Sequence, residues 1–133
     1  FRLPLRVYYE DTDAGGVVYY ANYLKFMERA RTEWLRSLGF EQDELMRNPG
    51  VVFAVRSCSL EFLKPARFND RLDVSLRVAK SGRASLTVDQ QILRGSETLC
   101  EGTVRIACLD AQRFTPAPIP AAIAACLPDR GAT

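Results

Sequence analysis

The hydrophobic periodicity of the chain changes once, and this change limits the possible folds more than any other feature. In residues 20–38 the apolar side chains recur at every third or fourth position, for example at Tyr23, Met27 and Ala30. This spacing predicts an amphipathic helix, and Gly39 directly after it is a typical helix end. Beyond residue 50 the period becomes two, which indicates strands.

Four segments with the period-two pattern follow the helix, at residues 51–64, 72–80, 83–94 and 97–110. Several connections between them are too short for a parallel crossover, which needs about a dozen residues, so neighbouring strands should be antiparallel. With a further strand at residues 2–9, the chain has five predicted strands and one long helix. We also expect short helices at residues 41–47 and 121–127.

The length of 133 residues suits one domain spanning residues 1–133. The predicted class is therefore α+β, with a five-stranded antiparallel sheet that must curl around the helix to bury its inner face. Such a sheet has open edges, and pairing two copies edge to edge would satisfy their backbone groups. We therefore expect a homo-oligomer, either a dimer or a dimer of dimers (a homotetramer).

The composition excludes several classes of function. The chain has no histidine, which removes Ser-His-Asp and Cys-His catalysis and metal sites that use histidine. Its 18 basic and 16 acidic residues give a net charge of +2, too balanced to indicate nucleic acid as a partner. No apolar run reaches the roughly 18 residues of a transmembrane helix, so we expect no membrane span.

The four cysteines, Cys58, Cys100, Cys108 and Cys126, form no Cys-x-x-Cys pair. Three of them lie in strongly apolar segments, so we expect reduced, buried thiols of the kind found in a cytoplasmic protein. No secretory signal peptide is visible in the sequence, which agrees with a cytoplasmic location.

Residues 8–23 carry the pattern that indicates chemistry. A predicted strand leads into an acidic turn with Asp11 and Asp13, then Gly15-Gly16, and then the start of the long helix. A helix N-terminus has free N–H groups and a positive dipole end, and so it can stabilise a developing oxyanion. Asp13, a few residues upstream, could reach the carbon next to that oxyanion, which is a hydrolase arrangement that needs no histidine.

Other interpretations of this turn remain open. A calcium loop would need a third acidic ligand where Gly15 stands, so we expect no metal. The glycine pair before a helix could cradle a phosphate, although it has the spacing of neither nucleotide-binding glycine motif. Asp11 and Asp13 could also merely form Asx turns, and we expect that structural role for Asp11.

The run YYEDTDAGGVVYYANYLKFMERARTEWL, residues 8–35, closely resembles the signature of the hotdog-fold acyl-CoA thioesterases. The branch it is most similar to is the YbgC type, associated with the Tol–Pal gene cluster, and the 4-hydroxybenzoyl-CoA thioesterases share a looser version. The resemblance implies the hotdog fold, a sheet wrapped around one helix, and hydrolysis of acyl-CoA to a free acid and coenzyme A. Coenzyme A would be part of the substrate, so no separate cofactor is expected.

The resemblance also assigns roles to residues. Asp13 matches the family's nucleophile, or the base that activates water, and Tyr20 matches the position whose backbone N–H polarises the thioester carbonyl. Many YbgC-type members have histidine at that place, whereas tyrosine is similar to the 4-hydroxybenzoyl branch, so an aromatic acyl group stays open. Gly16 would let the substrate pass close to the backbone.

Coenzyme A carries phosphates, which favour arginine and lysine. One candidate site is the basic turn with Lys80, Arg83 and Ser85, in a region that resembles the family's nucleotide-binding edge. Lys64 and Arg67 form a second candidate. Each group could equally be a solvated turn.

Three alternative functions remain at this stage. The thioester could belong to an acyl carrier protein, an acidic partner that the basic surplus would tolerate. The chain could be a hotdog module that binds acyl-CoA without hydrolysing it, although a binder gains nothing from a carboxylate facing the thioester. Hotdog dehydratases are generally associated with a catalytic histidine, which this chain lacks.

Overall fold

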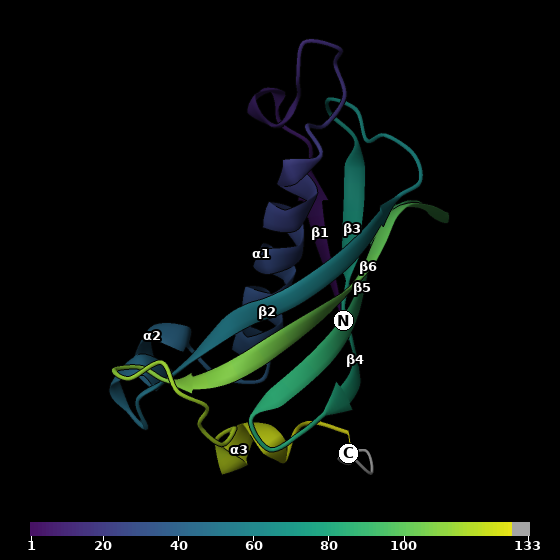
Figure 1. The fold of residues 1–133 in the computed structure, drawn as a ribbon. Helices are drawn as coiled ribbons and strands as arrows, with labels where there is room; N and C mark the ends of the chain where they lie inside the picture. Colours follow the sequence, from purple (N-terminus) through teal and green to yellow (C-terminus); the bar gives the residue numbers. More distant parts are fainter. Residues whose placement is uncertain (129–133) are drawn as a thin grey trace.

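The computed structural model describes residues 1–128 and shows one antiparallel sheet around a long helix (Figure 1). Six strands form the sheet: β1 (Arg2–Arg6), β2 (Val51–Phe62), β3 (Arg71–Ser75), β4 (Arg77–Ser81), β5 (Ser85–Arg94) and β6 (Glu97–Asp110). Their order is β1-β3-β5-β6-β2, with β4 paired to β5 beside β3. β1 and β2 are therefore the edges of this path.

The helices are α1 (Ala21–Ser37), α2 (Gln42–Arg47) and the short α3 (Ala121–Ala124), with a 3-10 turn η1 (Tyr9–Asp11) before α1. The sheet curls around α1, which packs on β1, β3 and β5 (Figure 1). The predicted long helix at residues 20–38 is confirmed to within a residue at each end. The described part of the chain contains no helix long and apolar enough to cross a membrane.

The core follows α1 in two clusters. The first lies under its N-terminal half, where Tyr23, Phe26 and Met27 are buried against β1 and β3. The second lies under the C-terminal half, where Leu35 joins side chains from α2, β5, β6 and α3. Because α1 is buried on this stripe along its whole length, its position relative to the sheet is firmly set.

The prediction of five strands is wrong by one, because the segment at residues 72–80 is divided. Both parts pair with β5, but at Leu76 the backbone N–H donates to the Phe1 carbonyl at 2.9 Å. The N-terminal ammonium of Phe1 in turn donates to the Leu76 carbonyl. These bonds continue the pairing of β1 with β3. The ladder with β5 is interrupted beside Leu76, where the Gln91 N–H donates to the Ser75 Oγ at 3.0 Å.

The first strand ends at Arg6 rather than at residue 9. η1 takes the following residues, because the Asp11 carboxylate accepts a hydrogen bond from the Tyr8 N–H at 2.8 Å and holds the turn closed. The expectation of buried thiols is correct for Cys100 and Cys108 and wrong for Cys58 and Cys126, which are exposed.

The structure shows why these two thiols are accessible. Cys58 lies on the edge strand β2 and lines an open cavity, and Cys126 lies beyond the short α3. All four thiols of the described chain are free.

Candidate functional site

Residues 12–18 form a small hairpin immediately before α1. Thr12 and Val18 are bridged, and the Asp13 N–H donates to the Val17 carbonyl at 2.9 Å. Gly16 closes the loop by donating to the Asp13 carbonyl at 3.0 Å, with φ of +77°. Three-residue hairpin loops commonly end in this left-handed conformation, which favours glycine. The glycine thus shapes the turn that presents Asp13.

The Asp13 carboxylate is exposed and held by its own turn. Its Oδ1 accepts a hydrogen bond from the Gly15 N–H at 2.8 Å. A Cβ at position 15 would come to 3.2 Å from the same oxygen, so glycine also leaves room for this approach. The side chain is therefore oriented but open to solvent.

Asp11 holds the backbone around the turn in place. Besides the bond from its carboxylate to Tyr8, its carbonyl accepts hydrogen bonds from the Tyr19 N–H at 3.0 Å and the Asn22 Nδ2 at 2.9 Å. These contacts tie η1 to the first turn of α1. The structural role predicted for Asp11 is confirmed, because both its carboxylate and its carbonyl hold the backbone together.

Tyr20 stands at the N-cap of α1. Its backbone N–H has no hydrogen-bond acceptor among residues 1–128, and this end of the helix carries the positive pole of the dipole. Its ring packs against Tyr19 and Phe62, with centroid distances of 4.8 and 6.0 Å. A short hairpin with an exposed carboxylate and a helix start with an unused donor are therefore neighbours in the chain.

The loop between β2 and β3 supports this hairpin. The Val18 N–H donates to the Ala66 carbonyl at 2.8 Å, and Val17 is bridged to Arg67. The Ala66 N–H donates to the Tyr23 hydroxyl at 2.9 Å, and burial raises the pKa of this tyrosine. Arg67, predicted as a phosphate ligand, thus lies on the loop that pairs with the hairpin carrying Asp13.

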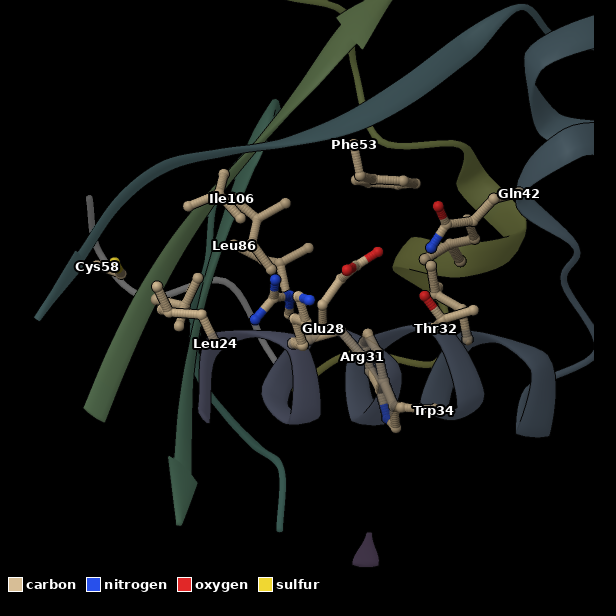
Figure 2. A pocket seen from close by; sticks show the side chains of 15 residues that line it. Leu24, Glu28, Arg31, Thr32, Trp34, Gln42, Phe53, Cys58, Leu86 and Ile106 are labelled. Atoms are coloured by element: carbon tan, nitrogen blue, oxygen red, sulfur yellow. The ribbon is translucent and has the colours of Figure 1, made fainter. Parts of the chain in front are cut away.

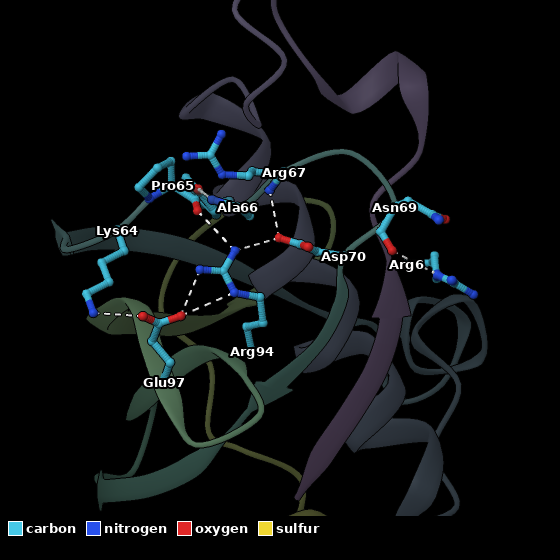
Figure 3. A network of polar contacts seen from close by, with 10 residues as sticks. Arg6, Lys64, Pro65, Ala66, Arg67, Asn69, Asp70, Arg94 and Glu97 are labelled. Atoms are coloured by element: carbon cyan, nitrogen blue, oxygen red, sulfur yellow. Dashed lines mark hydrogen bonds and ion pairs between the residues drawn. The ribbon is translucent and has the colours of Figure 1, made fainter.

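Charged side chains fix the same loop (Figure 3). Arg94 donates to the Asp70 carboxylate at 2.6 Å and to the Glu97 carboxylate at 2.7 Å, and Asp70 accepts the Arg67 N–H at 2.8 Å. Lys64 pairs with Glu97 at 2.7 Å, and the two cations hold the pKa of that carboxyl below its ordinary value. Lys64 is therefore already neutralised by a protein carboxylate.

The other predicted phosphate ligands lie elsewhere. Lys80, Arg83 and Ser85 surround the β4–β5 turn, where the Arg83 carbonyl accepts the Ile119 N–H at 2.8 Å. Figure 1 places this turn at the opposite end of the molecule from η1 and the hairpin. One chain alone therefore does not bring these three residues together with Asp13.

A largely apolar cavity of about 500 Å³ runs along α1 (Figure 2). α1 and β2 form two of its walls, and β5, β6 and α3 contribute others. Asp13 and Tyr20 do not line it, whereas Leu24, one turn into α1, does. Among its lining residues are the polar side chains Glu28 and Arg31.

Sequence reasoning missed this cavity, although two signals were present. Arg31 lies four residues after Met27 and four before Leu35, which puts a charge on the apolar stripe of the helix. Gln90 likewise interrupts the inward-facing series of β5 between Val88 and Ile92. The structure joins these two exceptions, since Arg31 donates to the Gln90 Oε1 at 3.0 Å.

Comparisons with known proteins identify the family of this chain. Residues 7–127 match the model of the family described as the thioesterase-like superfamily. The chain is 42% identical over 120 residues to the Haemophilus influenzae acyl-CoA thioesterase YbgC, covering 90% of this chain and 88% of that protein. It is 44% identical over 126 residues to the Escherichia coli acyl-CoA thioester hydrolase YbgC, covering 94% and 93% of the two chains.

A solved structure of a probable thioesterase from Bartonella henselae superposes with a TM-score of 0.87 at 35% identity. The match covers 90% of this chain and 98% of that one. The resemblance drawn from residues 8–35 is thus confirmed along nearly the whole chain. The protein belongs to the thioesterase-like superfamily, as a hotdog-fold enzyme of the YbgC type.

Proposed function

We propose that this enzyme hydrolyses acyl-CoA thioesters, with Asp13 as its working carboxylate. The observation that carries the proposal is the hairpin at residues 12–18, which holds an exposed carboxylate directly ahead of an unused helix N-terminus. The relatives named as acyl-CoA thioesterases of the YbgC type support the substrate class.

In the proposed mechanism the thioester carbonyl oxygen accepts the Tyr20 N–H, and the helix dipole stabilises the oxyanion. One preorganised donor of this kind is typically worth about 3 to 4 kcal/mol in the transition state. Two routes then lead to the acid. Asp13 attacks the carbonyl carbon and expels the thiolate, which takes a proton, and water cleaves the resulting anhydride. Alternatively, Asp13 accepts a proton from water as that water attacks.

The phosphates of coenzyme A would meet Arg67, whose loop pairs with the hairpin. Lys80, Arg83 and Ser85 could join the same substrate only from a second copy of the chain, because they lie at the other end of the protomer. Edge strands β1 and β2 offer unpaired backbone groups for such an assembly. A homodimer, or a dimer of dimers, in the cytoplasm is therefore part of the proposal.

The decisive experiment is thiol release from a panel of short, long and aromatic acyl-CoAs by the native enzyme and Asp13→Asn. We expect kcat to fall by about 10²-fold or more, which corresponds to about 2.7 kcal/mol of barrier. Glu10→Gln is the matched control, since it removes the same charge from an exposed neighbour in η1 and should keep activity.

Full activity of Asp13→Asn would remove this residue from the chemistry. A folded native enzyme that cleaves no acyl-CoA would refute the substrate class, and acyl carrier protein thioesters would then be assayed.

A further inference from the structure

Arg31 is held rigidly in the wall of the apolar cavity. Its Nη1 donates to the Gln90 Oε1 at 3.0 Å, and the Gln90 Nε2 donates to the Met27 carbonyl at 3.0 Å. Gln90 is only 1% exposed, so its amide cannot turn to another partner. The guanidinium of Arg31 is therefore fixed in orientation by a buried amide that is itself fixed to α1.

Most donors of this guanidinium are unused. An arginine carries five N–H donors, and among residues 1–128 the side chain of Arg31 makes one hydrogen bond and no ion pair. Loss of hydration in the cavity lowers the pKa of Arg31 from its ordinary value. The unused guanidinium nitrogens stay accessible to solvent, since no side-chain nitrogen or oxygen of the described residues is both buried and without a partner. An apolar occupant of the cavity would cover these donors without satisfying them, whereas an occupant that offers an acceptor would avoid that cost.

Glu28 stands one turn before Arg31 on the same wall, and Figure 2 shows its carboxylate reaching into the cavity. The negative charge of Glu28 acts on Arg31, but the two side chains form no ion pair among the described residues. We call the part of the cavity wall that they line the polar gap. The remaining walls are mostly apolar, with Leu86, Val104 and Ile106 among them.

The chemical group of a ligand decides how favourably it interacts with Arg31 and Glu28 in the polar gap. A carboxylate would suit Arg31 but be repelled by Glu28, and an ammonium would suit Glu28 but be repelled by Arg31. A plain alkyl chain would leave the guanidinium donors unsatisfied. A hydroxyl group is neutral, accepts from the guanidinium and donates to the carboxylate, so it matches both neighbours.

We propose that the cavity beside α1 binds the acyl group and that Arg31, with Glu28, selects acyl chains that carry a hydroxyl group far from the thioester. This inference rests on the proposed function for its starting point, the thioester at the Tyr20 N–H. It goes beyond that function in assigning the cavity and in naming the substrate class.

The helix sets the length of the chain that fits. Eight residues separate Tyr20 from Glu28, which is about 12 Å along the axis at ~1.5 Å per residue. An extended hydrocarbon with bonds of ~1.5 Å advances about 1.3 Å per bond, so about nine bonds span this distance. A decanoyl chain with a terminal hydroxyl places that group at the polar gap.

The test compares ω-hydroxydecanoyl-CoA with decanoyl-CoA, measuring kcat/KM for both in the same preparations. We expect the native enzyme to prefer the hydroxylated substrate by about tenfold or more, the usual size of one hydrogen bond to a charged group. Arg31→Met should abolish the preference while retaining activity on decanoyl-CoA. Arg29→Met is the matched control, because Arg29 is exposed on α1, lies over the Phe26 ring at 5.9 Å and does not line the cavity.

A second variant keeps the test decisive if Arg31→Met fails to fold. Glu28→Gln removes the repulsion of anions, and it should raise kcat/KM for the mono-CoA thioester of decanedioic acid relative to decanoyl-CoA. Equal kcat/KM values for the hydroxylated and plain chains in the native enzyme would overturn the inference, as would a preference that survives Arg31→Met.

Calorimetry with the free acids separates this inference from the proposed function. If no thioester is cleaved but ω-hydroxydecanoate binds more tightly than decanoate, and Arg31→Met removes the difference, the cavity assignment stands and the hydrolase proposal fails. If the thioesters are cleaved without discrimination, the hydrolase proposal stands and the specificity inference fails.

Discussion

Removing the hydroxyl of Tyr23 isolates one contact between the core and the candidate site. Tyr23 is 3% exposed, and its hydroxyl accepts the N–H of Ala66, which is fully buried. In Tyr23→Phe the ring keeps its packing against Phe26 and Phe62, at centroid distances of 6.3 and 5.6 Å. Only the acceptor is lost, and the buried Ala66 N–H has no other acceptor among the described residues.

The magnitude follows from that single orphaned donor. Leaving a buried N–H unsatisfied costs about 1 to 3 kcal/mol, so we expect the free energy of unfolding to fall by that amount. Urea unfolding followed by circular dichroism would show a lower midpoint with an unchanged m-value, because the surface exposed on unfolding is the same. Since Ala66 also accepts the Val18 N–H of the hairpin, kcat should fall as well.

Tyr9→Phe supplies the control. Tyr9 is 80% exposed, so deleting its hydroxyl should change the free energy of unfolding by less than about 0.5 kcal/mol. A loss in Tyr23→Phe no larger than in Tyr9→Phe would refute the reasoning, since it would mean that the Ala66 N–H finds another acceptor at little cost.

Two further predictions concern the sheet and the thiols. In Gly102→Ala the new Cβ would come within 2.6 Å of the Ser59 carbonyl on β2, and because backbone cannot move aside cheaply we expect about 1 to 3 kcal/mol of destabilisation in urea unfolding. Burial raises the pKa of Cys100 and of Cys108 to about 11, so at pH 8 a disulfide-exchange reagent should label two thiols rapidly in the native enzyme. All four should react after unfolding, and rapid native labelling of all four would contradict the buried positions.

Periodicity predicted the elements that are long and regular. The helix and the last strand were predicted at residues 20–38 and 97–110, almost as the structure has them. Their apolar residues recur with a period of 3.6 or 2, and neighbouring residues alone determine this pattern. The interruption between β3 and β4 is different in kind. There the Gln91 N–H donates to the Ser75 side chain, a contact between residues 16 apart that no local pattern contains.

The candidate site also has one part that the sequence predicts and another that it does not. Asp13, Gly16 and the helix start are close in the chain, so their arrangement could be anticipated from the residues and the family resemblance. The support from Ala66 and Arg94 could not, because it arises only when the 64–70 loop folds back over the first turn of the helix. The sequence also did not reveal that Lys80 and Arg83 lie far from the hairpin. From the sequence alone they were as good a candidate phosphate site as Lys64 and Arg67.

The proposed chemistry and the proposed selectivity therefore depend on different kinds of structure. In the proposed mechanism the reacting groups are one carboxylate and one backbone N–H, both within a single hairpin-helix unit. A chain without histidine therefore still has every group that this mechanism needs. The cavity instead draws on α1, β2, β5, β6 and α3, and Arg31 in its wall donates to Gln90 of β5, which in turn donates to the Met27 carbonyl of α1. If both proposals hold, substitutions in the cavity should change which acyl group is accepted and leave the hairpin, with the proposed hydrolytic step, intact.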